Sequence, residues 1–235
     1  MSESDSSKLH IVMFPWVAYG HFIPFIHLSN KLAQKGHQIS FLLPKGVQPK
    51  LENMNQCPSL IQFFPLVLPH VDGLPPDILK VLRPDVVLYD FWFWIPDLAR
   101  QLGICPVLYT VVSSMSMGLN TKELTKEMIV DEVMELPPGY PSSTVRLRAE
   151  EAAAMLFEAE DDVIAFRTCR EIEGPFLDFV GQGFGKLILL SGPCLSETKT
   201  EQLDNKWVNW LSKFEPGSVV FCSYGSQKPE YVAEI

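Results

Sequence analysis

The sequence is poor in basic residues and has no cysteine pattern of the kind that forms disulfide frameworks or zinc sites. Its 235 residues include 19 Lys and Arg against 28 Asp and Glu, which gives a formal net charge of −9. A chain this acidic is repelled by phosphate backbones and by anionic lipid surfaces, so we expect no nucleic-acid partner. The five cysteines are an odd number and include no C-x-x-C. We therefore expect no metal site and a reducing, cytoplasmic location.

Two catalytic signatures are also missing. There is no G-x-S-x-G, which disfavours a serine hydrolase, and no G-x-G-x-x-G after the first apolar run, which disfavours a nicotinamide-dependent dehydrogenase. The segment 181–185 (GQGFG) precedes an apolar run instead of following one, so we interpret it as a solvated turn and not as a phosphate loop. His10, His27 and His37 have no metal-ligand spacing and are interpreted as packing or surface residues.

Two long runs lack charged residues, but their composition disfavours membrane spans. Residues 9–30 and 101–121 contain no Asp, Glu, Lys or Arg and are long enough to cross a bilayer. Prolines, glycines and histidines or hydroxyl side chains interrupt both runs. A buried strand followed by a loop and the start of a helix explains them better, so we expect no integral membrane segment. The acidic start MSESDSSK is not a secretory signal.

Short apolar runs alternate with stretches of helical periodicity. Residues 10–14 (HIVMF) are typical of a strand buried on both faces. Apolar residues then recur at helical spacing up to Gly36, and we expect Pro24 in the first turn of that helix. Further strands are predicted at 38–43, 61–68, 86–89, 107–112, 163–166 and 186–190, and further helices at 95–102 and 171–180. This alternation predicts an α/β fold with a doubly wound parallel sheet.

The chain changes character after residue 192. Residues 1–192 form the first predicted domain, and residues 193–217 are predicted to hold a polar linker and a helix with one apolar stripe. Residues 218–235 begin with an apolar run at 218–224 that predicts a strand. Because a buried parallel strand needs neighbours, we expect this strand to begin a second, truncated α/β domain, and the chain to be about half of a two-domain protein.

One histidine and one aspartate follow predicted strands directly. His21 lies in the loop predicted after the first strand, and Asp90 follows the strand at 86–89. In open α/β sheets, ligands bind outside the carboxyl ends of the strands. At adjacent strand ends, the carboxylate would orient the imidazole and stabilise the imidazolium that forms when His21 takes up a proton. Each residue would otherwise cap the helix that follows it, and spacing alone leaves both interpretations open.

Five segments together resemble a known family. They are FPWVAYGHFIPFIHLSNKLAQKGHQISFLLP, LRPDVVLYDFWFWIPDLARQLGI, ELPPGYPSS, FRTCREIEGPFLDFV and WLSKFEPGSVVFCSYGSQ. In this order, and over nearly the whole chain, they resemble plant UDP-dependent glycosyltransferases. PPGYPSS and RTCREIEG are most similar to the branch that adds a second sugar to flavonoid or terpenoid glycosides. The resemblance implies the Rossmann-like, acceptor-binding N-terminal domain of a GT-B fold, with only the first strand of the second domain present.

The resemblance also implies a mechanism. His21 matches the general base that deprotonates the acceptor hydroxyl, and Asp90 matches the partner that holds and charges the histidine. The acceptor oxygen then attacks the anomeric carbon of the UDP-sugar, and UDP leaves with inversion. The UDP-sugar is a co-substrate, and no further cofactor is expected.

Other positions match substrate contacts of the family. Gly20 and Ser226 match donor-binding positions of the family, and the position that Ser226 matches lies near the phosphates of the donor. Tyr19, Phe22 and Trp92 would line the acceptor pocket, where flat aromatic aglycones stack well. Core packing is an equally weighted interpretation of these three aromatic residues.

Two features depart from the family pattern. The donor signature of the second domain, rich in Trp, Gly and His, is absent, so the donor sugar is undefined. The chain passes from HVDGLPP to VLRPD within a few residues, and only residues 77–82 (DILKVL) remain for the substantial helical stretch that relatives place there. The leading hypothesis is a monomeric inverting UDP-glycosyltransferase whose partners are a small-molecule acceptor and a UDP-sugar. The alternatives are a truncated, non-catalytic product that at most binds acceptors, and an unstable fragment.

Overall fold

The computed structural model describes residues 7–66, 77–119, 129–130, 133–134, 136–144, 163–195 and 203–222. It divides the chain into two compact units, Met1–Leu195 and Ser196–Ile235. Among the residues singled out from the sequence, Ser226 lies outside the described residues.

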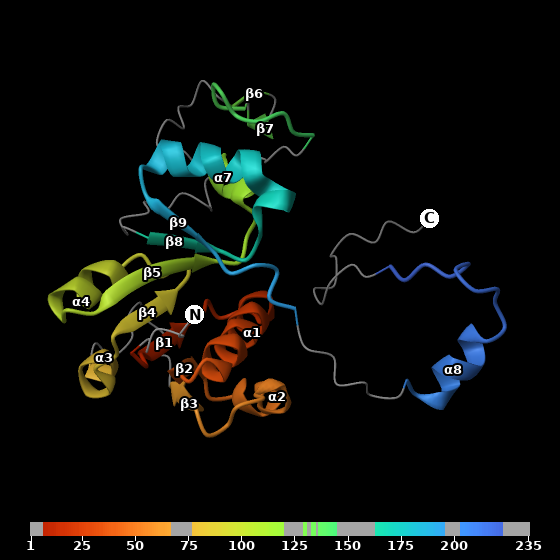
Figure 1. Cartoon of the computed structure of the whole chain (residues 1–235), viewed down its shortest axis with the longest axis horizontal. Helices are drawn as coiled ribbons and strands as arrows, with labels where there is room; N and C mark the ends of the chain where they lie inside the picture. Colours follow the sequence, from red (N-terminus) through yellow and green to blue (C-terminus); the bar gives the residue numbers. More distant parts are fainter. Residues whose placement is uncertain are drawn as a thin grey trace, which may run out of the picture. The chain divides into compact units, whose positions relative to one another are not determined.

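Unit 1 is built on a parallel sheet with the strand order β3-β2-β1-β4-β5-β8-β9, which confirms the predicted doubly wound α/β fold (Figure 1). The strands are β1 (His10–Phe14), β2 (Gln38–Pro44), β3 (Ile61–Leu66), β4 (Val86–Tyr89), β5 (Cys105–Thr110), β8 (Val163–Phe166) and β9 (Leu187–Leu190). A small antiparallel pair joins β6 (Ile129–Val130) to β7 (Val133–Met134). Because strand order reverses between β1 and β4, the carboxyl ends of these two strands flank the topological switch point of the sheet.

Helices cover both faces of this sheet. They are α1 (Tyr19–Gln34), α2 (Gln48–Leu51), η1 (Glu52–Met54), α3 (Asp77–Leu82), α4 (Ile95–Gln101), α5 (Ser114–Gly118) and α7 (Arg170–Phe184). Figure 1 shows α1 and α2 on one side of the sheet and α3 and α4 on the other. Alternate residues of β1 feed the two cores: Val12 and Phe14 belong to one buried cluster, and Ile11 and Met13 to the other. This is why the first apolar run does not alternate with polar residues.

Two helical expectations are corrected. The helix after β1 already begins at Tyr19, so Pro24 lies in its second turn and not in the first. Pro24 has no N–H for the carbonyl of Gly20, and Gly20 lies at an exposed position. The segment 181–185 is not a free turn: Gly181 lies in the last turn of α7, and Gly185 caps the helix in the left-handed conformation. A side chain at Gly181 would meet Ile188 of β9 at 3.3 Å, so the small residue allows close packing.

Strand β5 begins at Cys105, earlier than the predicted start at residue 107, and it includes Pro106. Pro106 pairs with Val87 of β4, whereas β8 pairs with β5 only from Leu108 onward. The missing N–H therefore falls where β5 has a partner on one side alone, a position that tolerates proline.

Unit 2 contains α8 (Asn205–Leu211), which confirms the predicted helix after the linker. Its aromatic residues contact one another: the ring centroids of Trp207 and Trp210 are 6.4 Å apart, and those of Trp210 and Phe214 are 4.8 Å apart. The strand predicted at 218–224 is not formed in residues 218–222, and the rest of it lies outside the described residues. A parallel strand requires a neighbour, and no described residue of unit 2 is in a strand.

The two uncharged runs of the sequence form strands and helices of unit 1. The first contains β1 and most of α1, and the second contains β5 and α5. In the described part of the chain, no helix combines the length and the apolar character that crossing a membrane requires.

Candidate active site

The loop after β1 brings His21 to the switch point of the sheet. Ala18 is extended, and its carbonyl accepts hydrogen bonds from the N–H groups of His21 and Phe22 at 2.9 and 3.0 Å, which begins α1. His21 therefore lies in the first turn of α1 and not in the preceding loop. The register of β1 and β4 ends with Phe14 opposite Tyr89, so the residues after both strands emerge side by side.

Asp90 connects the two segments. One carboxylate oxygen accepts a hydrogen bond from the backbone N–H of Trp16, and the other contacts Nδ1 of His21. The contact between His21 and Asp90, which spacing alone left open, is therefore present. A carboxylate only accepts hydrogen bonds, so the neutral imidazole that fits carries its proton on Nδ1.

The charge of Asp90 is deeply buried. Its side chain is 1% exposed, and Asp90 is the one buried carboxylate among the described residues. Burial raises the pKa of Asp90 above its ordinary value of 3.8, while the hydrogen bond with His21 acts in the opposite direction. Burying an ionisable group is costly, and such groups cluster at functional sites.

The imidazole of His21 is the accessible member of the pair, with 17% of its side chain exposed. Within the described part of the chain, Nε2 makes no hydrogen bond. A neutral histidine with Nδ1 held by a carboxylate and Nε2 open can take a proton from a bound hydroxyl group. This is the geometry that a general base with an orienting carboxylate requires.

Three apolar side chains near His21 are exposed: Trp16 (39%), Val17 (41%) and Tyr19 (37%). All three belong to the segment that leads from β1 into α1. Large exposed apolar side chains that gather at one place mark binding surfaces more often than isolated ones do. We call these three residues the apolar rim of the site.

The three predicted acceptor contacts occupy different environments. Tyr19 is in the apolar rim, and its ring receives the ammonium group of Lys50 at 4.8 Å. Trp92 is half-buried and stacks on Phe14, with ring centroids 4.8 Å apart. Phe22 is only 2% exposed and packs in the core beneath α1. Tyr19 is thus accessible, whereas Phe22 contributes to the core.

Of the two predicted donor contacts, Gly20 is described and exposed. It lies beside His21 in the first turn of α1, and a Cβ placed there would meet nothing within 4 Å. This open space is compatible with the close approach of a ligand to the backbone.

Sequence reasoning missed Phe91, the residue after Asp90. Phe91 has a φ of 50°, in the left-handed backbone region that residues other than glycine rarely adopt. Its ring contacts the imidazole of His21 with ring centroids 5.4 Å apart and planes at 74°. Neither the apolar character of Phe91 nor its place after the strand signals this backbone conformation.

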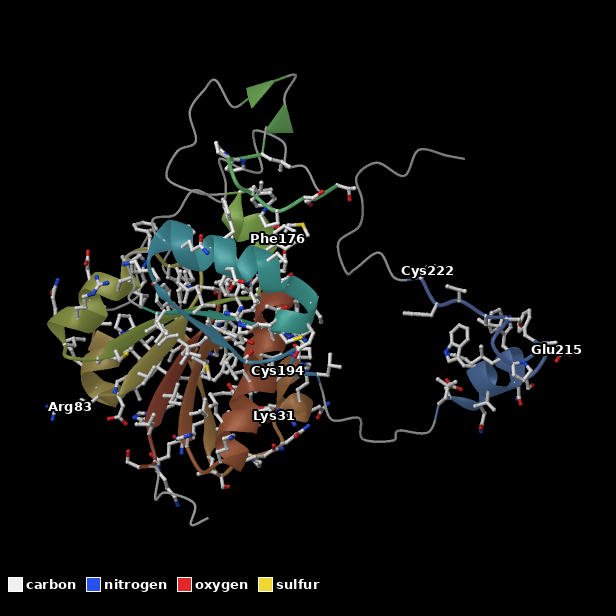
Figure 2. The ribbon with its side chains drawn as sticks, turned by 45° about the horizontal axis from the view of Figure 1, so that its top comes forward. Lys31, Arg83, Phe176, Cys194, Glu215 and Cys222 are labelled. Carbon is white, nitrogen blue, oxygen red and sulfur yellow. The ribbon has the colours of Figure 1, made fainter. Side chains whose placement is uncertain are left out.

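The other described histidines are held by single hydrogen bonds away from this site. Nε2 of His10 contacts the hydroxyl of Ser40 at 2.8 Å, and Nδ1 of His37 accepts the N–H of Leu9 at 3.1 Å. Nδ1 of His27 contacts the carbonyl of Cys194, which lies beside α1 (Figure 2). Among the described residues, His21 is therefore the histidine that combines a carboxylate partner with an open nitrogen.

Known proteins similar to this chain are named as glycosyltransferases. No family model matches the chain. A cyanidin 3-O-galactoside 2''-O-xylosyltransferase of Actinidia chinensis var. chinensis is 40% identical over 273 residues, which cover 93% of this chain and 59% of that protein. An anthocyanidin 3-O-glucoside 2'''-O-xylosyltransferase of Arabidopsis thaliana is 39% identical and is covered to 60% of its length, with 95% of this chain aligned.

The solved structures agree on the fold. A UGT transferase of Siraitia grosvenorii in complex with UDP superposes with a TM-score of 0.69 and 19% identity, over 94% of this chain and 60% of that one. The chain spans about 60% of the length of these relatives. The aligned stretch of 273 residues also exceeds the 235 residues of the chain, so the Actinidia relative has internal residues without a counterpart here.

Proposed function

We propose that this chain, which is homologous to plant UDP-dependent glycosyltransferases of the sugar-extending flavonoid branch, is the part of such an enzyme that binds the acceptor and carries the base. The reaction is transfer of a sugar from a UDP-sugar to a hydroxyl group of a flavonoid glycoside. The single observation that carries the proposal is the buried carboxylate of Asp90 on Nδ1 of His21, at the switch point of the sheet.

In the proposed reaction, Nε2 of His21 takes the proton of the acceptor hydroxyl as its oxygen attacks the anomeric carbon. The new carbon–oxygen bond forms as the bond to the diphosphate breaks, and UDP leaves with that electron pair and with inversion at the carbon. Asp90 stabilises the imidazolium that forms, and its buried position makes this interaction stronger than it would be in water. His21 then releases the proton to solvent.

The apolar rim supports a flat, partly apolar acceptor. Its tryptophan and tyrosine are partly exposed and can contact a flat aromatic ring, and a sugar-bearing aglycone would leave its hydroxyl groups toward His21. The relatives are named for cyanidin 3-O-galactoside and anthocyanidin 3-O-glucoside. A flavonoid glycoside is therefore the acceptor class that we propose. The proposal includes a monomeric, cytoplasmic protein, and the five unpaired cysteines fit a reducing compartment.

The proposal is tested by separating acceptor binding from transfer. Binding of cyanidin 3-O-galactoside to the 235-residue chain is measured by quenching of tryptophan fluorescence, with free tryptophan as the control for absorption by the ligand. Transfer from UDP-xylose is measured for the chain alone and for a chimera, in which the chain is joined to the part of the Actinidia relative beyond the aligned stretch. We expect binding by the chain and transfer by the chimera. Failure of both would contradict the proposal.

Replacing Gly20 by alanine tests the donor position. Since a Cβ at Gly20 meets nothing within 4 Å, the free energy of unfolding measured by urea titration should be unchanged or higher, by up to about 1 kcal/mol for a helical position. The added methyl group would stand where the donor approaches the backbone, so the KM of the chimera for the UDP-sugar should rise several-fold. Gly46→Ala, also in open space, is the matched control and should leave KM unchanged. An unaltered KM for Gly20→Ala would remove Gly20 from the donor site.

A further inference from the structure

We propose that Phe91 is a positioning residue, whose ring holds the imidazole of His21 in the orientation that keeps Nδ1 on Asp90. This inference rests on the proposed function, in which His21 is the base. It assigns a role to a residue that touches the histidine and that neither the sequence pattern nor the comparisons single out.

The backbone at Phe91 explains how two consecutive residues reach the same imidazole. In an extended strand, successive side chains point to opposite faces, so residues 90 and 91 could not both contact His21 if β4 simply continued. The chain departs from the extended conformation at this point: Phe91 has a φ of 50°, while β4 ends at Tyr89. The turn places the carboxylate of Asp90 and the ring of Phe91 on one partner.

This conformation is unfavourable for a residue with a Cβ, and such residues persist where the surrounding contacts enforce them. The contacts here are aromatic. The Phe91 ring packs against His21 at 5.4 Å between centroids and against Trp16 at 6.1 Å, with planes at 74° and 61°. The N–H of Trp16 in turn donates to Asp90. Phe91 and Asp90 thus both contact the imidazole, and Trp16 contacts each of these two residues.

The ring matters because one hydrogen bond does not fix an imidazole. A side chain held only at Nδ1 can still turn about its bond to the backbone, and 17% of the His21 side chain is exposed. Rotation away from Asp90 would allow the second tautomer, with the proton on Nε2, which cannot accept a proton from the acceptor. A phenyl ring set nearly perpendicular to the imidazole plane blocks that rotation.

The test is nitrogen NMR of the 235-residue chain labelled with ¹⁵N-histidine, with the His21 signals assigned by their loss in His21→Gln. At a pH where the imidazole is neutral, the two ring-nitrogen shifts report the tautomer. Phe91→Ala should move the two shifts toward each other, as the second tautomer becomes populated, and Phe91→Tyr should restore the wild-type pattern. Phe93→Ala is the matched control, because Phe93 belongs to the same loop and is 76% exposed; its spectrum should match the wild type.

Two further variants, Phe91→Leu and Asp90→Asn, complete the test. Phe91→Leu retains apolar volume without a flat ring, and it serves if Phe91→Ala lowers the thermal midpoint so far that the chain unfolds. Wild-type ring-nitrogen shifts in folded Phe91→Ala or Phe91→Leu would overturn the role of Phe91. Asp90→Asn separates this failure from failure of the proposed function: it should shift the proton to Nε2 whatever Phe91 does. An unchanged tautomer in Asp90→Asn would instead contradict the pairing on which the proposed function depends.

Discussion

His21→Ala is expected to lower sugar transfer by the chimera by about 10²–10⁴-fold, the range that a positioned general base contributes. The alanine variant keeps the sheet, the apolar rim and Asp90, and it removes only the group that takes the proton of the acceptor. Because substrate binding does not depend on the imidazole in this mechanism, the loss should fall on kcat, with a small change in the KM of the acceptor. The measurement is the initial rate of xylosylation of cyanidin 3-O-galactoside over a range of acceptor concentrations.

His37→Ala is the control for loss of an imidazole as such. His37 accepts a backbone hydrogen bond from Leu9, outside the candidate site. Its substitution should leave kcat close to that of the unmodified chimera. If His21→Ala retained a kcat similar to that of His37→Ala, the assignment of His21 as the base would be wrong.

Asp90→Asn is expected to lower transfer by up to about 10⁴-fold without unfolding the chain. The amide oxygen can still accept the N–H of Trp16, but the amide nitrogen would donate to Nδ1 of His21. The proton of the imidazole then moves to Nε2, and the nitrogen that faces the acceptor can no longer take a proton. The substitution is nearly equal in size, so the effect on rate arises from the tautomer and the lost charge.

The stability of the same variant has a defined pH dependence. Burial raises the folded-state pKa of Asp90 above 3.8, so the unfolded chain releases this proton first as pH rises. Between 3.8 and the raised pKa, the folded state binds more protons than the unfolded state, and the free energy of unfolding of the wild type falls with pH. Asparagine does not titrate at this position, so the free energy of unfolding of Asp90→Asn does not include this decrease. Its free energy of unfolding relative to the wild type should therefore increase as pH is raised from 3.8, as measured by urea titration. A relative stability that decreased over this interval would contradict the burial of a costly carboxylate.

Much of the sheet was predictable, because buried strands carry a local signal. The predicted bounds of β1, β4 and β8 match the observed ones, since each is a short, uninterrupted apolar run. Proline misled the prediction at β5, where Pro106 is tolerated because one neighbour is missing. The tolerance depends on strand pairing, which is a property of the topology and not of the local sequence.

The pair of His21 and Asp90 was predictable in outline but not in geometry. Each residue follows a strand, and the sequence supports the proximity of such positions. The contact itself requires that β1 and β4 be neighbours, which only the strand order establishes. The left-handed conformation of Phe91 was not predictable, because phenylalanine ordinarily disfavours it and the surrounding contacts impose it. The resemblance to sugar-extending plant glycosyltransferases, by contrast, is confirmed by the relatives.

The central claim is that Asp90 holds His21 as a base with its open nitrogen toward the acceptor. The most direct measurement is the ¹⁵N spectrum of His21 in the unmodified 235-residue chain, at a pH where the imidazole is neutral. We predict a proton on Nδ1, in contact with Asp90, and an unprotonated Nε2. A proton on Nε2, or an equal mixture of the two tautomers, would contradict it.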